Sequence, residues 1–340
     1  MKRLAFTYLI ALILSSCMVA DAQQLVDQVD TRFQGIEEIS VEGVFCDVTV
    51  EPGSSDEVHL NGEIRSTRTT NDLAIKTSQN GSKLRVWIEH PKNLRGNVKG
   101  FLMFEVPEDV LLNVSNVSGD VKVTNIGSDN MSLSTVSGNI NVTGAGANAG
   151  LKSVSGNITA SVINGALTSK SVSGDQAISN VKGAFTGQST SGNFSLKMVE
   201  GISRVTSTSG DLVGENLMEG GDFRSTSGNI QLNIVSGDLS VKSVSGDVRL
   251  SDVTGSLDIS TTSGNQQGDK IMILKSGNFN SISGDINMDL ENSMESLSFR
   301  LKSGSGNLVA GDSRADENLL IEKGDIWIRA SSTSGDQTFN

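Results

Sequence analysis

The chain has 340 residues, with 37 glycines, only 3 prolines and 4% aromatic residues, a balance that suits a thin stacked β core better than a thick globular one. Its 27 Lys and Arg against 39 Asp and Glu give a formal net charge of −12 at pH 7, a poor match for the phosphates of nucleic acid. With Cys17 in a leader, Cys46 has no partner, and a disulfide scaffold is excluded.

The first 22 residues have the pattern of a secretory signal peptide. A basic pair at 2–3 precedes an apolar stretch over 4–14, whose 11 residues are too few for a permanent membrane span. Two processing sites compete. Ala-Asp-Ala at 20–22 fits a cleavage site, and Leu-Ser-Ser-Cys ending at Cys17 resembles a bacterial lipobox that would place a lipid on that cysteine. Both alternatives predict an exported protein of the periplasm, outer membrane or cell surface.

Residues 23–112 alternate apolar and polar side chains without a longer repeat. Such alternation predicts half-buried β-strands, which we place at 39–41, 44–50, 58–60, 73–75, 84–88 and 101–106. Pro52-Gly53 and Asn80-Gly81 mark turns between them. We expect this segment to form an N-terminal β cap or the first irregular coils, because the first coil of a stack would otherwise leave an open strand edge.

Residues 65–100 of this cap are locally basic, with eight Lys and Arg against Asp72 and Glu89. A solvated sheet face is one interpretation of this charge. A patch for anionic glycan or lipid headgroups is the other. The candidate residues for such a patch are Lys83, Arg85, Lys92 and Arg95.

Beyond residue 112 the triplet Ser-Gly-Asp/Asn returns every 18 residues, without exception from Gly138 to Gly264. A fixed period of this length is typical of a solenoid, in which each repeat is one coil stacked on the last. Within a coil the apolar residues step by two, with one step of three, which indicates two short strands joined by a corner. We therefore predict an all-β parallel β-solenoid, of the two-sheet β-roll or β-helix type, with 18-residue coils. The regular coils should occupy 113–310 and a C-terminal cap 311–340, where the repeat weakens.

The triplet glycine shares the parity of the inward residues, at a corner that needs positive φ or a close backbone approach. The residue after it then points outward, and stacked coils place its equivalents about 4.8 Å apart. No two Asp are adjacent in this series, which avoids like charges side by side. We expect a structural ladder of amide–carboxylate hydrogen bonds, formed by Asp120, Asn139, Asn157, Asp175, Asn193, Asp211, Asn229, Asp247, Asn265, Asp285 and Asn307.

A second hydroxyl row lies two residues before the triplet serine. It is formed by Thr135, Ser153, Ser171, Ser189, Ser207, Ser225, Ser243 and Thr261. The first interpretation is a ladder of hydroxyls that stabilise the turn. The alternative is a regular exposed array that faces ice.

The sequence offers little material for catalysis or metal binding. The halves of each coil lack the acidic position of calcium-binding G-G-x-G-x-D-x-U-x repeats. His59 and His90 are the only histidines, and Cys46 shares the parity of neighbouring apolar residues, as a small buried side chain does. The acids are spread periodically, whereas a polysaccharide-cleaving cleft needs them clustered. We predict a non-enzyme without cofactor or metal.

The opening from Phe33 to Val50, FQGIEEISVEGVFCDVTV, resembles the start of bacterial putative-adhesin domains of unknown function, including head domains named by analogy with autotransporter adhesins. The repeats of the form Val-Ser-Gly-Asp/Asn, as at 172–175, are similar to the same group. The resemblance covers most of residues 33–340 and implies a secreted or lipid-anchored β-solenoid of the cell envelope. It supplies no catalytic residues, and fold does not settle function.

Three functional hypotheses follow. The first is a non-catalytic adhesin, interaction or scaffold protein whose partner is another envelope macromolecule, protein or glycan, with membrane attachment through a lipid on Cys17. The second is a module that binds envelope glycan or lipid headgroups through residues 65–100. The third is a polysaccharide-active enzyme.

Overall fold

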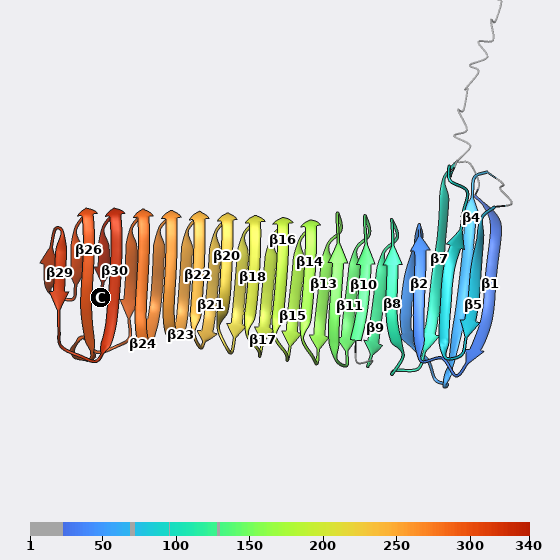
Figure 1. Ribbon diagram of the computed structural model, residues 1–340, viewed down its shortest axis with the longest axis horizontal. Coiled ribbons are helices and arrows are strands. Elements are labelled where there is room, and N and C mark those ends of the chain that lie inside the picture. The colour runs from blue at the N-terminus through green and yellow to red at the C-terminus, as the bar shows by residue number, and fades with distance from the viewer. Residues whose placement is uncertain (1–22, 69–71, 95, 128–129) are drawn as a thin grey trace, which may run out of the picture.

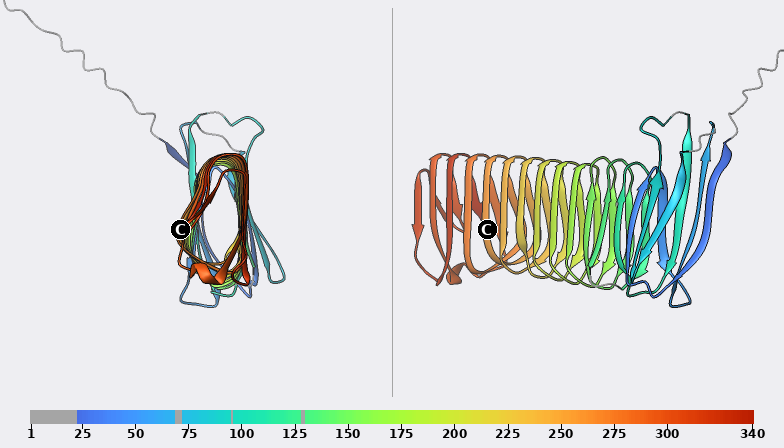
Figure 2. Two further views of the ribbon diagram at one scale, coloured as in Figure 1. Left: turned by 90° about the vertical axis from the view of Figure 1, so that its left-hand side faces the viewer. Right: turned by 45° about the vertical axis from the view of Figure 1, so that its right-hand side comes forward.

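The computed structural model describes residues 23–68, 72–94, 96–127 and 130–340. They form a long rod of stacked β coils with longer, less regular strands at its N-terminal end (Figure 1). Viewed along the rod, the coils form a flattened ring of two facing sheets (Figure 2). The predicted all-β parallel solenoid with 18-residue coils is confirmed: in neighbouring coils Leu151 pairs with Ser169, and Val142 with Ala160. Residues 1–22, for which the sequence predicts a signal peptide and which include Cys17, lie outside the described residues, as does Arg95.

The first sheet is formed by β2 (Glu38–Val44), β5 (Ala74–Asn80), β6 (Lys83–Glu89), β8 (Leu111–Asn116), β10 (Asn130–Thr135), β12 (Asn148–Ser153), β14 (Leu167–Ser173), β16 (Phe185–Ser191), β18 (Ser203–Ser209), β20 (Gly221–Ser227), β22 (Leu239–Ser245), β26 (Leu297–Ser305), β29 (Asn318–Ile321) and β30 (Ile326–Ser334). The second is formed by β1 (Gln24–Gln34), β3 (Cys46–Pro52), β4 (Glu57–Ser66), β7 (Val98–Val106), β9 (Val121–Ile126), β11 (Ile140–Ala145), β13 (Ile158–Ile163), β15 (Gln176–Val181), β17 (Phe194–Val199), β19 (Leu212–Leu217), β21 (Ile230–Ser236), β25 (Ile286–Leu290), β27 (Leu308–Ala310), β28 (Ser313–Ala315) and β31 (Gln337–Phe339). Two long strands, β23 (Val248–Ser263) and β24 (Gln266–Ser283), run through both sheets. Among the described residues the helical element is the 3-10 turn η1 (Met294–Ser296), and no helix there has the length and apolar character needed to cross a membrane.

The core lies between the two sheets. Step-two apolar residues point inward, as β23 illustrates: Val248, Leu250, Leu257 and Ile259 are each at most 3% exposed. Equivalent residues of adjacent coils stack in register, so the core is one continuous cluster along the rod. A single coil could not bury these side chains on its own, which is why stacking and folding go together.

Stacking order and chain order differ at both ends of the rod. Strands β30 and β31 pair with β24 and β25 on one side and with β26 and β27 on the other. Residues 326–340, which the weakened repeat predicts as part of a C-terminal cap, thus form a coil inside the stack. At the N-terminal end, β2 and β3 likewise lie between β6–β7 and β8–β9.

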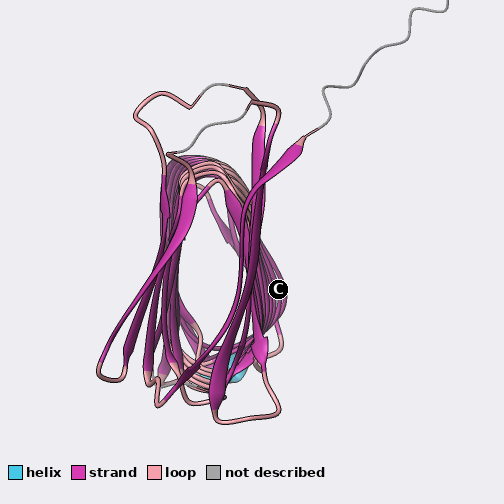
Figure 3. Cartoon of the chain, turned by 90° about the vertical axis from the view of Figure 1, so that its right-hand side faces the viewer, coloured by secondary structure: helices cyan, strands magenta, loops and turns pink. Residues whose placement is uncertain are grey.

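Antiparallel strands close the ends of both sheets. Strand β5 pairs with β6, and β4 followed by β1 pairs with β7. Figure 3 shows the N-terminal end of the rod, where longer strands lie in front of the ring of coils. At the other end, β29 covers β26 and β28 covers β27. These strands protect the edges of the parallel stack, whose free N–H and C=O groups would otherwise recruit further strands.

The hydroxyl row from Thr135 to Thr261 is buried, so the ice-facing alternative is wrong. The backbone N–H groups of Gly138 and Gly156 donate to the hydroxyls of Thr135 and Ser153 at 3.0 and 2.8 Å, as a turn-stabilising role requires. From Ser171 onward most of these hydroxyls have no partner, because the triplet glycine N–H donates to the next coil instead, as Gly174 does to Ser191 O at 3.1 Å. The turn-stabilising role therefore holds in the first coils and again at Thr261, whose hydroxyl donates to Gly264 O at 3.1 Å.

Between residues 125 and 270, the second corner of each coil, which leads from the second sheet back to the first, holds one residue in left-handed backbone conformation. Its φ lies between 50° and 58° in the eight residues Asn125, Val162, Asn180, Met198, Asn216, Ile234, Asp252 and Lys270. Asn and Asp tolerate this conformation, whereas a β-branched side chain there is strained. Val162 and Ile234 are therefore strained positions.

We expect the double substitution Val162→Asn and Ile234→Asn to stabilise the rod by about 1 kcal/mol at each site, because it relieves left-handed strain. Little packing is lost, since the two residues are 47% and 45% exposed. Thermal unfolding should show a higher melting temperature than for the parent chain. Val172→Asn is the matched control, because Val172 is also 47% exposed but has an ordinary φ. An equal rise of the melting temperature in the control would contradict backbone strain at Val162 and Ile234.

Candidate functional site: the outer faces of the coils

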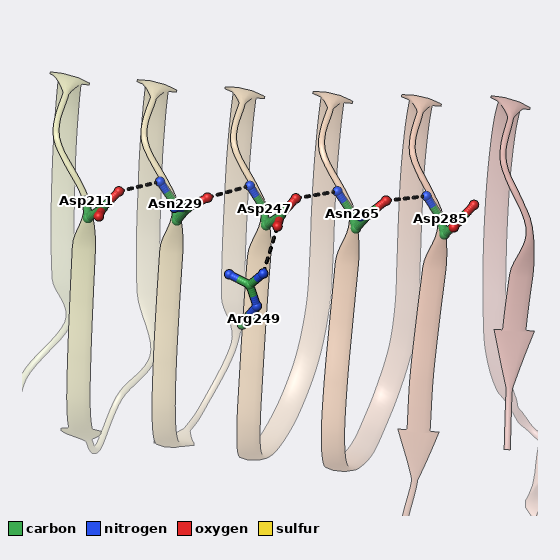
Figure 4. Close-up of polar contacts among 6 residues, drawn as sticks. All are labelled: Asp211, Asn229, Asp247, Arg249, Asn265 and Asp285. Carbon is green, nitrogen blue, oxygen red and sulfur yellow. Dashed lines mark hydrogen bonds and ion pairs between the residues drawn. The ribbon is translucent and has the colours of Figure 1, made fainter.

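The Asp/Asn residues of the triplets form a continuous row of hydrogen bonds at the first corner (Figure 4). In each step the backbone N–H of one residue donates to the side-chain Oδ1 of its neighbour, as Asp211 does to Asn193 at 2.9 Å and Asn229 to Asp211 at 2.8 Å. A side-chain amide also donates in two steps, from Asn139 to Asp120 and from Asn307 to Asp336, both at 3.2 Å. The ladder thus joins side-chain oxygen to backbone, and carboxylate and amide oxygens serve it equally.

The inserted coils alter the sequence of charges along this ladder. Asp336 lies between Asp285 and Asn307, accepting from Asn307 N–H at 2.7 Å and donating its own N–H to Asp285 at 2.9 Å. At the other end Asp120 N–H donates to Asp47 at 2.9 Å. Two Asp–Asp neighbours therefore exist in space, where the linear sequence predicted strict separation.

Replacing Asn193 and Asn229 with Asp should lower the stability of the rod by about 1–3 kcal/mol at low salt. The N–H bonds survive, but positions 175, 193, 211, 229 and 247 then hold five successive carboxylates about 4.8 Å apart. The loss should shrink in 0.5 M salt, where screening is stronger. Asp211→Asn keeps the bond and removes a charge, so it should cost nothing. An unchanged melting temperature in the double variant would show that charge spacing is irrelevant.

Two of the four bases of the predicted N-terminal patch are neutralised by acids on adjacent strands. Lys83 Nζ lies 2.6 Å from Glu38 Oε2, and Arg85 Nη2 lies 2.9 Å from Glu42 Oε1. Of the four candidates, only Lys92 is both within the described residues and without an ion pair there. The geometry therefore favours the solvated-face interpretation for residues 65–100.

The surroundings of Cys46 and His59 indicate that both side chains have structural roles. Burial raises the pKa of the Cys46 thiol to about 12, with a smaller contribution from Asp47, so the thiol stays protonated at neutral pH. His59 Nε2 lies 2.8 Å from Asp30 Oδ1 and its Nδ1 lies 3.3 Å from Glu105 Oε2, which ties β4 to β1 and β7. Over the described residues there is no group of three or more His, Cys, Asp or Glu placed to hold a metal ion.

The two carboxylates raise the pKa of His59, chiefly through the hydrogen bond to Asp30 and then that to Glu105. Their stabilisation is complete below the ordinary histidine pKa of about 6.5 and is lost as pH rises through the raised folded-state value. We expect the melting temperature of the parent chain to fall modestly from pH 6 to pH 8.5. His59→Gln should remove that fall, which thermal unfolding at several pH values measures. An unchanged pH dependence in the variant would exclude His59 as its source.

The outer surface of the first sheet concentrates positive charge. From β12 to β26, two adjacent rows of outward side chains hold eight bases and two acids, a net charge of +6. We call this surface the basic face; its bases are Lys152, Lys170, Arg204, Arg224, Lys242, Arg329, Arg300 and Lys302, and its acids are Asp222 and Asp258. Among the described residues, Arg224 alone of these bases has an ion pair, with Asp222 at 2.5 Å.

The second sheet has no such surplus. Its two equivalent rows from β11 to β24 carry two bases and two acids. Both bases are paired, Lys197 with Glu215 at 3.3 Å and Arg249 with Asp247 at 2.8 Å. The charge of the coils is therefore segregated onto one side of the rod.

The inserted C-terminal coil builds the densest part of the basic face. Strand β30 brings Arg329 into register with Arg300 of β26, and Lys302 lies in the next row. The guanidinium carbons of Arg300 and Arg329 lie 5.4 and 5.5 Å from the ring centroid of Trp327, within cation–π range. A shallow groove of about 350 Å3 lies here, lined by Asp258, Asn278, Asn280, Arg300, Lys302, Arg329, Ala330 and Ser331.

The sequence contains a signal for the basic face in the position of five of its bases. Lys152, Lys170, Arg224, Lys242 and Lys302 each stand four residues before a triplet glycine, in the pattern Lys/Arg-Ser-x-Ser-Gly. The shared offset alone places these five bases in one row. The Arg300–Arg329 pair had no such signal, because it depends on the insertion of β30.

A sequence model of the family described as Toastrack DUF4097 matches residues 36–215 and 203–339. Among curated proteins, none matches the sequence significantly. Three similar solved structures are a "putative cell adhesion protein" from Clostridium sporogenes (10% identity over 92% of this chain and 98% of that chain, TM-score 0.19), a "putative adhesin" from Parabacteroides merdae (12%, 73% and 97%, TM-score 0.24) and a "putative lipid binding protein" from Parabacteroides distasonis (12%, 92% and 98%, TM-score 0.25). At TM-scores this low, we draw no argument from them.

Proposed function

The chain belongs to the Toastrack DUF4097 family, and from that premise we propose that it is a non-catalytic β-solenoid of the bacterial cell envelope that binds another envelope macromolecule along its side. The observation that carries the proposal is the segregation of charge. An acidic chain with a formal net charge of −12 presents a face of net +6 over ten successive strands. Charge arranged in this way promotes and orients association with an oppositely charged partner.

Export is part of this proposal and rests on the pattern of residues 1–22. Attachment to a membrane through a lipid on Cys17 and release after cleavage at residue 22 are the two alternatives. In either form, the rod would act outside the cytoplasm as an adhesin-like or scaffold protein.

The two other hypotheses have less support. A binding module centred on residues 65–100 is disfavoured because Lys83 and Arg85 already pair with acids. A polysaccharide-active enzyme is disfavoured because the Asp residues of the ladder each accept a backbone N–H and stand in a row, not across a cleft.

Cell fractionation and an envelope-retention assay test the proposal. The full-length chain should appear in the envelope or exported fraction. Its exported form, once purified, should bind isolated envelopes saturably, and rising salt should weaken that binding. A chain that stays in the cytoplasmic fraction, or exported protein that shows no saturable retention, would overturn the proposed function.

A further inference from the structure

Resting on that function, we propose that the basic face binds a linear acidic polysaccharide laid across the strands, and that Arg300, Lys302 and Arg329 form its principal anchoring point. The basic face is long and narrow, and we call its two rows of outward side chains the track. Its ten strands lie about 4.8 Å apart and span roughly 45 Å along the rod, whereas its two rows are only about 7 Å wide. A thread-like partner matches these proportions.

The charge of the track matches a polyanion. One of its rows, from Lys152 to Lys302, contains five bases and no acid. Seven of the eight bases on the whole face have no ion-pair partner within the described part of the chain, so a ligand need not displace a paired carboxylate from them. Asp258 also lines the groove beside Arg300 and Arg329. Binding a polyanion there would release its counterions, which makes the affinity fall steeply with salt.

A flat anionic membrane matches the surface less well. The ladder carboxylates of Asp175, Asp211, Asp247, Asp285 and Asp336 run along the corner that borders the track. For example, Asp175 follows Lys170 by only five residues. A plane of anionic headgroups wider than the track would approach this acidic border, whereas a single chain would not.

The side chains between the bases suit sugar hydroxyls. Ser240, Ser260, Asn278 and Asn280 stand in the two rows among the charged residues and offer both donors and acceptors. Nucleic acid would instead be held by base stacking on aromatic rings, and the track offers only Trp327, which two guanidinium groups already contact.

At the C-terminal end of the track, two guanidinium groups are held in positions that suit the binding of a carboxylate or sulfate group. Contact with the Trp327 ring limits the motion of both guanidinium groups, and neither has an ion-pair partner among the described residues. Arginine can bind such a group through two parallel N–H bonds. Asn278, Asn280 and Ser331 line the same groove of about 350 Å3, beside the charges.

Titration calorimetry with the exported protein tests the proposal, using polygalacturonate as the acidic glycan and dextran as the neutral one. Polygalacturonate should bind in low salt and dextran should not. The double variant Arg300→Glu/Arg329→Glu should weaken polygalacturonate binding at least tenfold and reduce its salt dependence. The matched control is Lys182→Glu/Arg314→Glu, which makes the same charge change at two exposed bases off the track and should alter binding less than twofold.

Four results would overturn the proposal: no binding of polygalacturonate by the parent chain, equal loss in both double variants, tighter binding of phosphatidylglycerol vesicles than of polygalacturonate, or tighter binding of single-stranded poly(dT). Melting curves of both variants establish that they fold; if Arg300→Glu/Arg329→Glu unfolds, Lys152→Glu/Lys170→Glu takes its place on the track. Envelope retention separates this inference from the proposed function. If the parent chain is retained saturably by envelopes but does not bind polygalacturonate, this inference fails and the proposed function still stands.

Discussion

Replacing Gly192 with alanine should cost about 3 kcal/mol or more of folding free energy and sharply lower the melting temperature. A Cβ at this position would lie 2.2 Å from the carbonyl oxygen of Gly174 and 2.7 Å from its carbonyl carbon. Both are backbone atoms of the preceding coil, which cannot swing aside as a flexible side chain could. The φ of +142° is also one that residues with a side chain rarely adopt.

The close approach cannot relax without loss elsewhere. Gly192 N–H donates to Ser209 O at 3.1 Å in the coil on the other side, and Asn193 N–H donates to Asp175 at 2.8 Å. Moving the corner outward to admit a methyl group would break these inter-coil bonds, which hold successive coils together. The cost therefore combines steric strain with lost hydrogen bonds.

Gly150→Ala is the matched control, because it makes the same chemical change in the same stack. The nearest atom to a Cβ there is Met131 O at 3.8 Å, and the φ of Gly150 is not positive. Alanine at this strand position should be neutral or stabilise by up to about 1 kcal/mol. Similar melting temperatures for the two variants would show that the close approach to the Gly174 backbone is not what requires glycine at position 192.

The sequence predicted the regular part of the fold well for a physical reason. The parity of Gly192 and its equivalents placed them among the inward residues at a corner, and the 18-residue period required stacked coils. The first inference depends on neighbouring residues within one repeat, and the second on the regular recurrence of that repeat along the chain. The structure confirms the resulting parallel stack, in which Phe185 pairs with Ser203 and Phe194 with Leu212.

The order of the coils at the two ends of the rod could not be predicted in this way. A repeat pattern implies that coils adjacent in the chain are also adjacent in space, and at the ends they are not. Asp336 follows Asn307 in sequence but precedes it in the ladder. The same insertion places Arg329 beside Arg300, so the principal anchoring point of the proposed binding track was not visible as a motif. The N-terminal patch was predicted from the balance of charges within residues 65–100 alone. That balance left out the ion-pair partners of Lys83 and Arg85, because Glu38 and Glu42 lie more than 40 residues earlier in the chain.

Phe339→Ala should destabilise the rod by about 3–5 kcal/mol, although Phe339 is the penultimate residue of the chain. Terminal residues usually fray and tolerate change. Here the inserted coil buries the side chain completely, between Phe279 of the preceding coil at 5.5 Å and Phe299 of the following coil at 5.9 Å between ring centroids. Backbone bonds fix it further, since Gly311 N–H donates to Phe339 O at 2.9 Å.

The size of this effect decides whether the last coil lies inside the stack. A C-terminal cap resting on the end of the rod would lose one face of contact, whereas an inserted coil loses contacts on both faces and leaves a cavity between two coils. Phe101→Ala is the control, because Phe101 is 40% exposed and its loss should cost less than about 1.5 kcal/mol. Chemical denaturation measures both. Because Trp327 belongs to the same coil as Phe339, its fluorescence should change at lower denaturant in Phe339→Ala than in Phe101→Ala. Coincident transitions in the two variants would place residues 326–340 outside the stack.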